Sequence, residues 1–109
     1  MRKAKRERLE AAGWKVGSTK DFLHLSPNEL ALIEMKLALA RDIRTRRLRQ
    51  KLTQNQLAKL VDSSQSRVAK MEAADATVSL DLLIRALLVL GASRKQVARI
   101  IAWEGKHAA

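Results

Sequence analysis

The stretch from residue 52 to residue 72 places two short helices, each with its own start signal, only a few residues apart. Thr53 and Ser64 can each offer a side-chain oxygen to the unpaired backbone N–H groups at the start of a helix. Between the two helices, the polar pair Asp62 and Ser63 leaves room for a turn and nothing longer. Where two steeply crossing helices must touch, the chain has short or aliphatic side chains, namely Leu57, Ala58, Val61, Val68 and Met71. The segment therefore predicts two tightly packed helices joined by a turn.

The second of these helices would expose small and amide side chains at its start, followed by a cation. Gln65 can pair with adenine through two hydrogen bonds, Ser66 can donate or accept, and Arg67 favours guanine or a phosphate. Ser and Gln are common at exposed helix starts of every kind, so these residues indicate DNA contact only together with the flanking helices and the charge of the chain. On that combination, we predict that Gln65, Ser66 and Arg67 contact bases.

The same segment and its flanks carry a larger pattern, which comprises Leu52-Thr53-Gln54, Leu57-Ala58, Ser64-Gln65-Ser66, Val68, Met71-Glu72, Val78-Ser79-Leu80 and Leu83. With this pattern, residues from about 43 to 97 resemble the Cro/repressor-type (XRE) helix-turn-helix family. The resemblance implies an all-α, five-helix, lambda-repressor-like domain that binds double-stranded DNA as a dimer.

Four positions depart from the family pattern. Asp62 stands in the turn where Gly is usual, and Ser63 stands where an apolar residue is usual. Asp tolerates a left-handed backbone better than most non-glycine residues, so the turn can form at modest cost. Ala74 replaces the Gly that often ends the second helix, and Arg46 replaces an aliphatic residue of the first helix of the domain.

Several polar and basic residues around the motif are candidates for contacts with the DNA backbone. The resemblance suggests that Gln54 braces a phosphate or its neighbour Gln65, and a cation one turn beyond Ser66 would reach the backbone. The predicted phosphate contacts are Gln54, Ser64, Lys70, Arg44 and Arg47. For any single cation, an unengaged surface position is an equal alternative. Glu72 is acidic, so we expect it to pair with a nearby Arg or to cap a neighbouring helix instead of contacting a base.

The charge of the chain indicates a polyanionic partner. Lys and Arg number 22 against 11 Asp and Glu, which gives a formal net charge of +11 in 109 residues. A mixed, solvated surface would not need such an excess, and nucleic acid is the better explanation. The cations cluster at residues 2–8 and at residues 41–51.

A long helix is expected before the motif. Ser26, Pro27 and Glu29 form a strong helix start, and the helix should run to near Gln50. Its apolar residues form two stripes, one of Leu30, Ile33, Leu37 and Ala40 and the other of Leu32, Met35, Leu39 and Ile43. Two stripes need two packing partners. One stripe would close the core, and the other would meet a second subunit or another protein.

Two further helices are expected after the motif. The first is strongly apolar and runs from Leu80 to Leu90, and Asp81 and Arg85 mark its solvent-exposed face. Gly91 should end it as a left-handed cap. Ser93 starts a final helix that contains Trp103, which is either a lid on the core or an anchor for a dimer. We divide the chain into a basic N-terminal extension, residues 1–25, and a helix-turn-helix domain, residues 26–109.

The first dozen residues are basic and form either a frayed helix ending at Gly13 or a disordered tail. The following apolar residues, Trp14, Val16, Phe22, Leu23 and Leu25, are expected to pack on the domain or on a partner.

Composition argues against catalysis and against membrane insertion. Cysteine is absent from the sequence, which excludes disulfides and thiolate metal sites. His24 and His107 lack neighbours arranged for catalysis or metal binding, and the sequence contains no Gly-rich phosphate loop. We therefore expect no enzyme, no metal and no cofactor. The sequence lacks an apolar run long enough for a membrane span and shows no secretory signal, so we expect a cytoplasmic protein.

The sequence favours a homodimeric transcriptional regulator, a repressor that binds a palindromic operator. The alternative is a HigA-type antitoxin, which would bind a toxin protein and regulate its own operon. The resemblance extends weakly to residues 13–16 and 22–26, which are similar to N-terminal arms of small regulators of this kind. A third hypothesis is a general nucleic-acid-binding protein that uses the basic tail alone.

Overall fold

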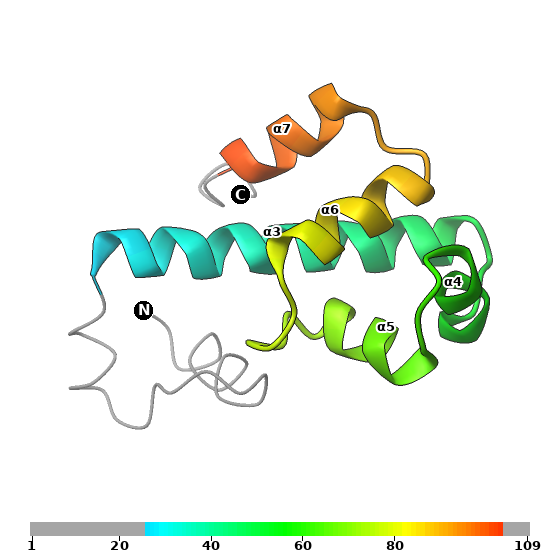
Figure 1. The fold of residues 1–109 in the computed structure, drawn as a ribbon. Helices are drawn as coiled ribbons and strands as arrows, with labels where there is room; N and C mark the ends of the chain where they lie inside the picture. The colour runs from blue at the N-terminus through cyan, green and yellow to red at the C-terminus, as the bar shows by residue number, and fades with distance from the viewer. Residues whose placement is uncertain (1–25, 104–109) are drawn as a thin grey trace.

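Five helices and no strand make up the part of the chain that the computed structural model describes, residues 26–103 (Figure 1). The helices are α3 (Pro27–Arg49), α4 (Gln54–Leu60), α5 (Gln65–Glu72), α6 (Leu80–Val89) and α7 (Arg94–Ala102). The predicted all-α, five-helix architecture is confirmed. The N-terminal extension, with its basic segment, its apolar stretch and His24, lies outside the described residues. Residues 104–109, with His107, lie outside them as well.

A Ser or Thr precedes every one of these five helices. The caps are Ser26, Thr53, Ser64, Ser79 and Ser93, and each side-chain oxygen accepts a hydrogen bond from the backbone N–H three residues later. At Thr53 and Ser93 the side chain of the third helical residue, Gln56 or Gln96, also accepts from the backbone N–H of the cap. These bonds satisfy N–H groups that have no partner inside the helix, and each cap contributes roughly 1 kcal/mol.

Helices α3 to α6 end in the same way, with a residue of left-handed backbone. These residues are Lys51, Asp62, Ala74 and Gly91, with φ of 59°, 54°, 54° and 97°. After each one, the next backbone N–H donates to the carbonyl five residues earlier, as Ser63 does to Ala58 at 2.8 Å and Asp75 to Lys70 at 3.0 Å. The predicted left-handed cap at Gly91 and the predicted tolerance of Asp62 are confirmed. Ala74 fixes the end of α5 at Glu72 although it is not glycine.

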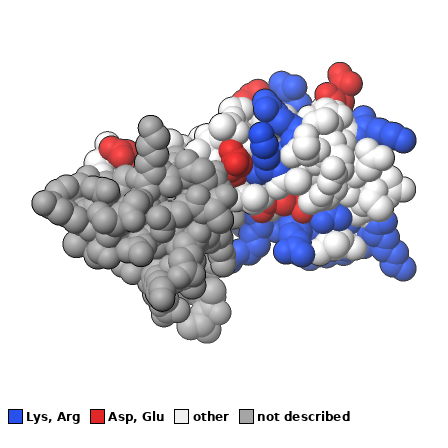
Figure 2. Space-filling model, turned by 90° about the horizontal axis from the view of Figure 1, so that it is seen from below, with Lys and Arg blue, Asp and Glu red and all other residues white. Residues whose placement is uncertain are grey.

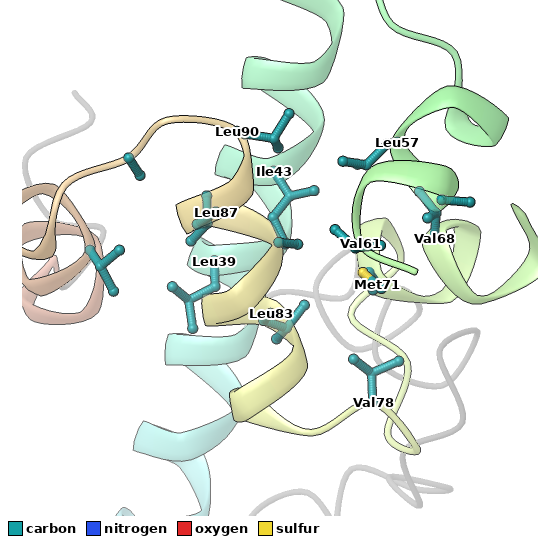
Figure 3. Close-up of a cluster of buried hydrophobic side chains, with 14 residues drawn as sticks. Leu39, Ile43, Leu57, Val61, Val68, Met71, Val78, Leu83, Leu87 and Leu90 are labelled. Carbon is teal, nitrogen blue, oxygen red and sulfur yellow. The ribbon is translucent and has the colours of Figure 1, made fainter. Parts of the chain in front are cut away.

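The core lies around the second half of α3, where side chains of all five described helices meet (Figure 3). Leu39 and Ile43 of α3 are 0% exposed and form the centre of this cluster. The other fully buried large side chains are Leu57 of α4, Val68 and Met71 of α5, Val78 of the following loop, and Leu83 and Leu87 of α6. Full burial of each large aliphatic side chain contributes roughly 1.5–3 kcal/mol. The core therefore holds the motif helices α4 and α5 firmly to α3.

The predicted stripes of α3 are only partly right. The continuous buried face of this helix runs between them, through Ile33, Lys36, Ala40, Ile43 and Arg47, at intervals of three and four residues. Leu32, assigned to one stripe, is instead 40% exposed. The prediction went wrong because it used apolar residues alone, whereas two cations occupy the buried face. The need for two packing partners is met within the chain, since α5 and α7 lie on opposite sides of α3 (Figure 1).

The prediction that Trp103 belongs to the last helix is wrong. Helix α7 ends at Ala102, and Trp103 follows it as the C-terminal cap with an extended backbone. The side chain is half-buried, and Cζ of Arg41 in α3 lies 5.2 Å from the centre of its ring. Trp103 also lines a hollow of about 320 Å³ between α3 and α7. These contacts place the ring against α3 but outside the main core cluster, so the choice between a lid on the core and an anchor for a dimer stays a prediction.

Candidate nucleic-acid interface

Helices α4 and α5 form a compact unit because small residues and a sharp turn let them approach each other. Ala58 of α4 is 2% exposed and belongs to the same core cluster as Val68 and Met71 of α5. Asp62 takes the left-handed conformation that reverses the chain, and the hydroxyl of Ser64 accepts from the backbone N–H of Arg67 at 3.2 Å. Val68 and Met71 are fully buried and fix the rotation of α5 about its axis. The unit is thus the helix-turn-helix that the sequence predicted.

The start of α5 is exposed to solvent. Ser64, Gln65, Ser66 and Arg67 are all exposed, while the side of α5 that carries Val68 and Met71 faces the core. Helix α5 lies along the lower side of the molecule in Figure 1. The predicted base-contacting residues are therefore adjacent, accessible and carried by a helix that the core holds in place.

A buried ion pair joins α3 to the end of α5. Nε of Arg47 donates to Oε2 of Glu72 at 2.5 Å, and Nη2 donates to Oε1 at 2.9 Å. The two side chains are only 10% and 5% exposed. The hydrogen bonds to Glu72 raise the pKa of the Arg47 guanidinium above its usual value. A third bond, from Nη1 to the carbonyl of Leu52 at 2.8 Å, means that each of the three guanidinium nitrogens of Arg47 donates inside the protein.

The carboxylate of Glu72 is also connected to the exposed edge of α5 through α4. Nε2 of Gln54 donates to Oε1 of Glu72 at 3.2 Å, and Oε1 of Gln54 accepts from Nε2 of Gln65 at 2.8 Å. Gln54 thus braces Gln65, one of the two roles that the resemblance suggested for it. The result is an unbroken path of hydrogen bonds from Arg47 in α3 to Gln65.

Cations border this surface. Figure 2 views the molecule from below, the side on which α5 lies, and shows Lys and Arg at the edges of a largely uncharged area. Lys70 is exposed one turn after Ser66 and Arg67. Arg44 is exposed on α3, three residues before Arg47, whose side chain contacts Glu72 of α5. Exposed hydrogen-bonding side chains with cations beside them are the arrangement that a protein needs to contact base edges and the flanking phosphates.

Comparison with known families decides the assignment. A family model described as helix-turn-helix matches residues 43–100. The chain belongs to the Cro/repressor-type (XRE) helix-turn-helix family. The comparison with curated proteins and the comparison with solved structures found no match. As a member of this family, the helix-turn-helix protein is a DNA-binding transcription regulator.

The structure of this helix-turn-helix protein argues against one predicted phosphate contact. Arg47 is buried, and its nitrogens donate to Glu72 and to the carbonyl of Leu52, so it is not free to bind a phosphate. The expectation that Glu72 pairs with an Arg is confirmed. The position of Arg47 carries a signal that the sequence analysis missed, since it lies four residues after Ile43 and seven after Ala40, on the core side of the helix.

The sequence analysis also predicted that the protein holds no metal and does not span a membrane. Among residues 26–103, no group of three or more metal-ligating side chains comes together. No helix in that range is long and apolar enough to span a membrane.

Proposed function

We propose that this protein is a sequence-specific repressor that binds a palindromic operator as a homodimer, with the start of α5 in the DNA major groove. The observation that carries the proposal is the bare edge of α5, where four consecutive hydrogen-bonding side chains are exposed on a helix fixed by the core. The major groove admits an α-helix and presents a distinct donor and acceptor pattern for each base pair.

Gln65, Ser66 and Arg67 are the base-contacting residues in this proposal. The Gln65 side chain suits adenine, Arg67 suits guanine or a flanking phosphate, and Ser66 is short enough to let the helix approach closely. The hydroxyl of Ser66 lies 3.3 Å from that of Ser64.

Four residues supply the proposed phosphate contacts. The Nε2 of Gln54 keeps one N–H beyond the one that it donates to Glu72, and Ser64 lies at the start of α5, where backbone N–H groups favour an anion. Lys70 and Arg44 are exposed cations and contact the backbone by charge. Arg47 is left out of this set because Glu72 engages it.

The length of α5 supports a dimer. Eight residues span about 12 Å and contact only a few base pairs, which gives one subunit little selectivity. Two copies related by a two-fold axis would place their α5 helices in successive major grooves about 34 Å apart. Repression needs only stable occupancy of a promoter, which such a dimer provides.

The proposal is tested by selecting bound fragments from a random DNA pool with the full chain. We expect an inverted repeat whose half-sites are about 10–10.5 base pairs apart, centre to centre, bound by two subunits in sedimentation velocity. Recovery of fragments without a common sequence would contradict the proposal. It would instead support the hypothesis of a general nucleic-acid-binding protein that uses the basic tail.

The HigA-type antitoxin stays the alternative prediction, and one observation is relevant to it. Leu88 and Val89 of α6 are 48% and 41% exposed, so an apolar contact surface remains away from the start of α5. A second subunit and a toxin would both suit this surface. Copurification of the chain with a short, basic protein encoded by a neighbouring gene would establish the antitoxin. Purification of the dimer alone from a strain that expresses both proteins would reject the antitoxin hypothesis.

A further inference from the structure

We propose that Glu72, which lies behind the DNA-contacting edge, is a positioning residue that sets the orientation of the Gln65 amide and thereby the base that Gln65 selects. This inference rests on the proposed function, because it concerns how α5 distinguishes bases. It adds a specificity-determining role for a buried side chain of α5 that does not itself lie at the exposed edge.

The first step is the orientation of Gln54. Both oxygens of Glu72 accept hydrogen bonds from Arg47, and a carboxylate in an ion pair can only accept. Gln54 must therefore turn its NH₂ group toward Glu72, as the 3.2 Å contact from Nε2 to Oε1 shows. The flipped amide would place an oxygen of Gln54 against a carboxylate oxygen, so it is disfavoured.

The second step is the orientation of Gln65. Because the NH₂ group of Gln54 faces Glu72, its carbonyl oxygen faces Gln65 and needs a donor. Gln65 supplies that donor through Nε2, at 2.8 Å. An amide side chain on its own has two nearly equivalent orientations, which differ by the exchange of oxygen and nitrogen. The path from Glu72 leaves only one of them for Gln65.

The consequence is a defined outward pattern. With one N–H of Gln65 given to Gln54, one N–H donor and the Oε1 acceptor remain for DNA. Adenine presents the matching pair in the major groove, an N7 acceptor and an N6 donor, whereas guanine presents two acceptors, N7 and O6. In the opposite orientation, Oε1 of Gln65 would face Gln54 and both N–H groups would be available, which suits guanine. Glu72 thus favours adenine over guanine at this position.

The experiment measures the ratio of affinities for two operators that differ only by A·T or G·C at the position of Gln65. For the wild-type full chain we expect a preference for adenine of about tenfold or more. Gln54→Met removes the hydrogen bonds of residue 54 to Glu72 and to Gln65. It leaves the ion pair of Arg47 with Glu72 in place. We expect this variant to keep its thermal stability while the preference falls below about threefold.

A second variant tests the origin of the effect at Glu72. The double substitution Arg47→Met with Glu72→Gln leaves no unpaired charge in the interior, and an amide at position 72 can donate as well as accept. The preference for adenine should fall here too. Lys70→Ala is the control, because it removes a proposed phosphate contact and leaves the path from Glu72 to Gln65 intact, so affinity should fall for both operators while the preference for adenine persists.

The outcomes separate this inference from the proposed function. If the wild-type chain shows no preference among operators, the proposed function itself fails. If the wild-type chain prefers adenine and Gln54→Met keeps the full preference, the positioning role of Glu72 is wrong and the hydrogen-bond path only stabilises the fold.

Discussion

Arginines of one helix serve different purposes according to the side of the helix on which they lie. Arg44 and Arg47 are three residues apart on α3, and the first is exposed whereas the second is buried against Glu72. Removing one member of a buried ion pair leaves the other charge without a partner or water, which is much more costly than losing an exposed charge. Residue type alone therefore does not identify the DNA-contacting cations.

The two arginines give a matched pair of variants. Arg47→Ala should lower the free energy of unfolding by about 3–5 kcal/mol, because Glu72 loses its buried partner. Arg44→Ala should change it by no more than about 0.5 kcal/mol but should weaken DNA binding. Urea unfolding and DNA titration of both variants measure these effects. Equal stability of the two variants would contradict the structural role of Arg47.

Lys70 should act on every DNA sequence alike. Lys70→Ala removes one proposed phosphate contact, so affinity for operator and for random DNA should fall by the same factor. The slope of log affinity against log salt concentration should decrease by about 0.9. Lys95→Ala is the control, since Lys95 is exposed on α7, on the opposite side of α3 from α5 (Figure 1). A loss confined to the operator would assign Lys70 to base contact.

At the scale of helices and turns, the sequence predicted the starts and ends well. Ser, Thr, Pro and Gly act locally, so the caps at Thr53, Ser64 and Gly91 could be identified without knowledge of the packing. The buried face of α3 and the position of Trp103 could not, because they depend on which neighbour each side meets. The link between Gln54 and Glu72 joins residues 18 positions apart, and no local pattern predicts it.

The turn between α4 and α5 carries a backbone cost that a single substitution removes. Asp62 has a φ of 54°, and glycine adopts this region without a steric penalty. Asp62→Gly should therefore raise the free energy of unfolding by about 1 kcal/mol in urea or thermal unfolding. Asp62→Ala is the control and should give no such gain, because alanine has the penalty of a Cβ atom. A gain from alanine equal to that from glycine would show that the charge, and not the backbone, matters.

The loop after α5 should make the fold sensitive to acid. Oδ1 of Asp75 accepts from the hydroxyl of Thr77 at 2.6 Å and from its backbone N–H at 2.9 Å. These bonds hold the pKa of the Asp75 carboxyl below its usual value. A depressed pKa stabilises the folded state above the ordinary pKa of Asp, and this contribution disappears as the pH falls through the folded value.

We therefore expect the wild-type chain to lose more stability between about pH 5 and pH 2 than Asp75→Asn does. The asparagine oxygen can still accept from Thr77, but it does not titrate. Thermal unfolding of both proteins across that range measures the difference. Parallel pH profiles would show that Asp75 contributes nothing to acid sensitivity.

At the scale of the whole molecule, the fold separates support from recognition. The long helix α3 carries α5 on one side and α7 on the other, and its buried residues fix both (Figure 1). The charge of +11 attracts any DNA, so it favours encounter without selecting a sequence. Selection in this account comes from the start of α5 alone, and a dimer would double it through symmetry.

The most direct test of this account is a double-mutant cycle between Gln65 and one base pair of the operator. Affinities of the wild-type chain and Gln65→Ala are measured for the operator and for the operator altered at a single base pair, at each position in turn. We predict a coupling free energy of about 1–3 kcal/mol at one base pair per half-site and near zero elsewhere. Additive effects at every position would mean that Gln65 contacts no base, and the proposed role of α5 would be wrong.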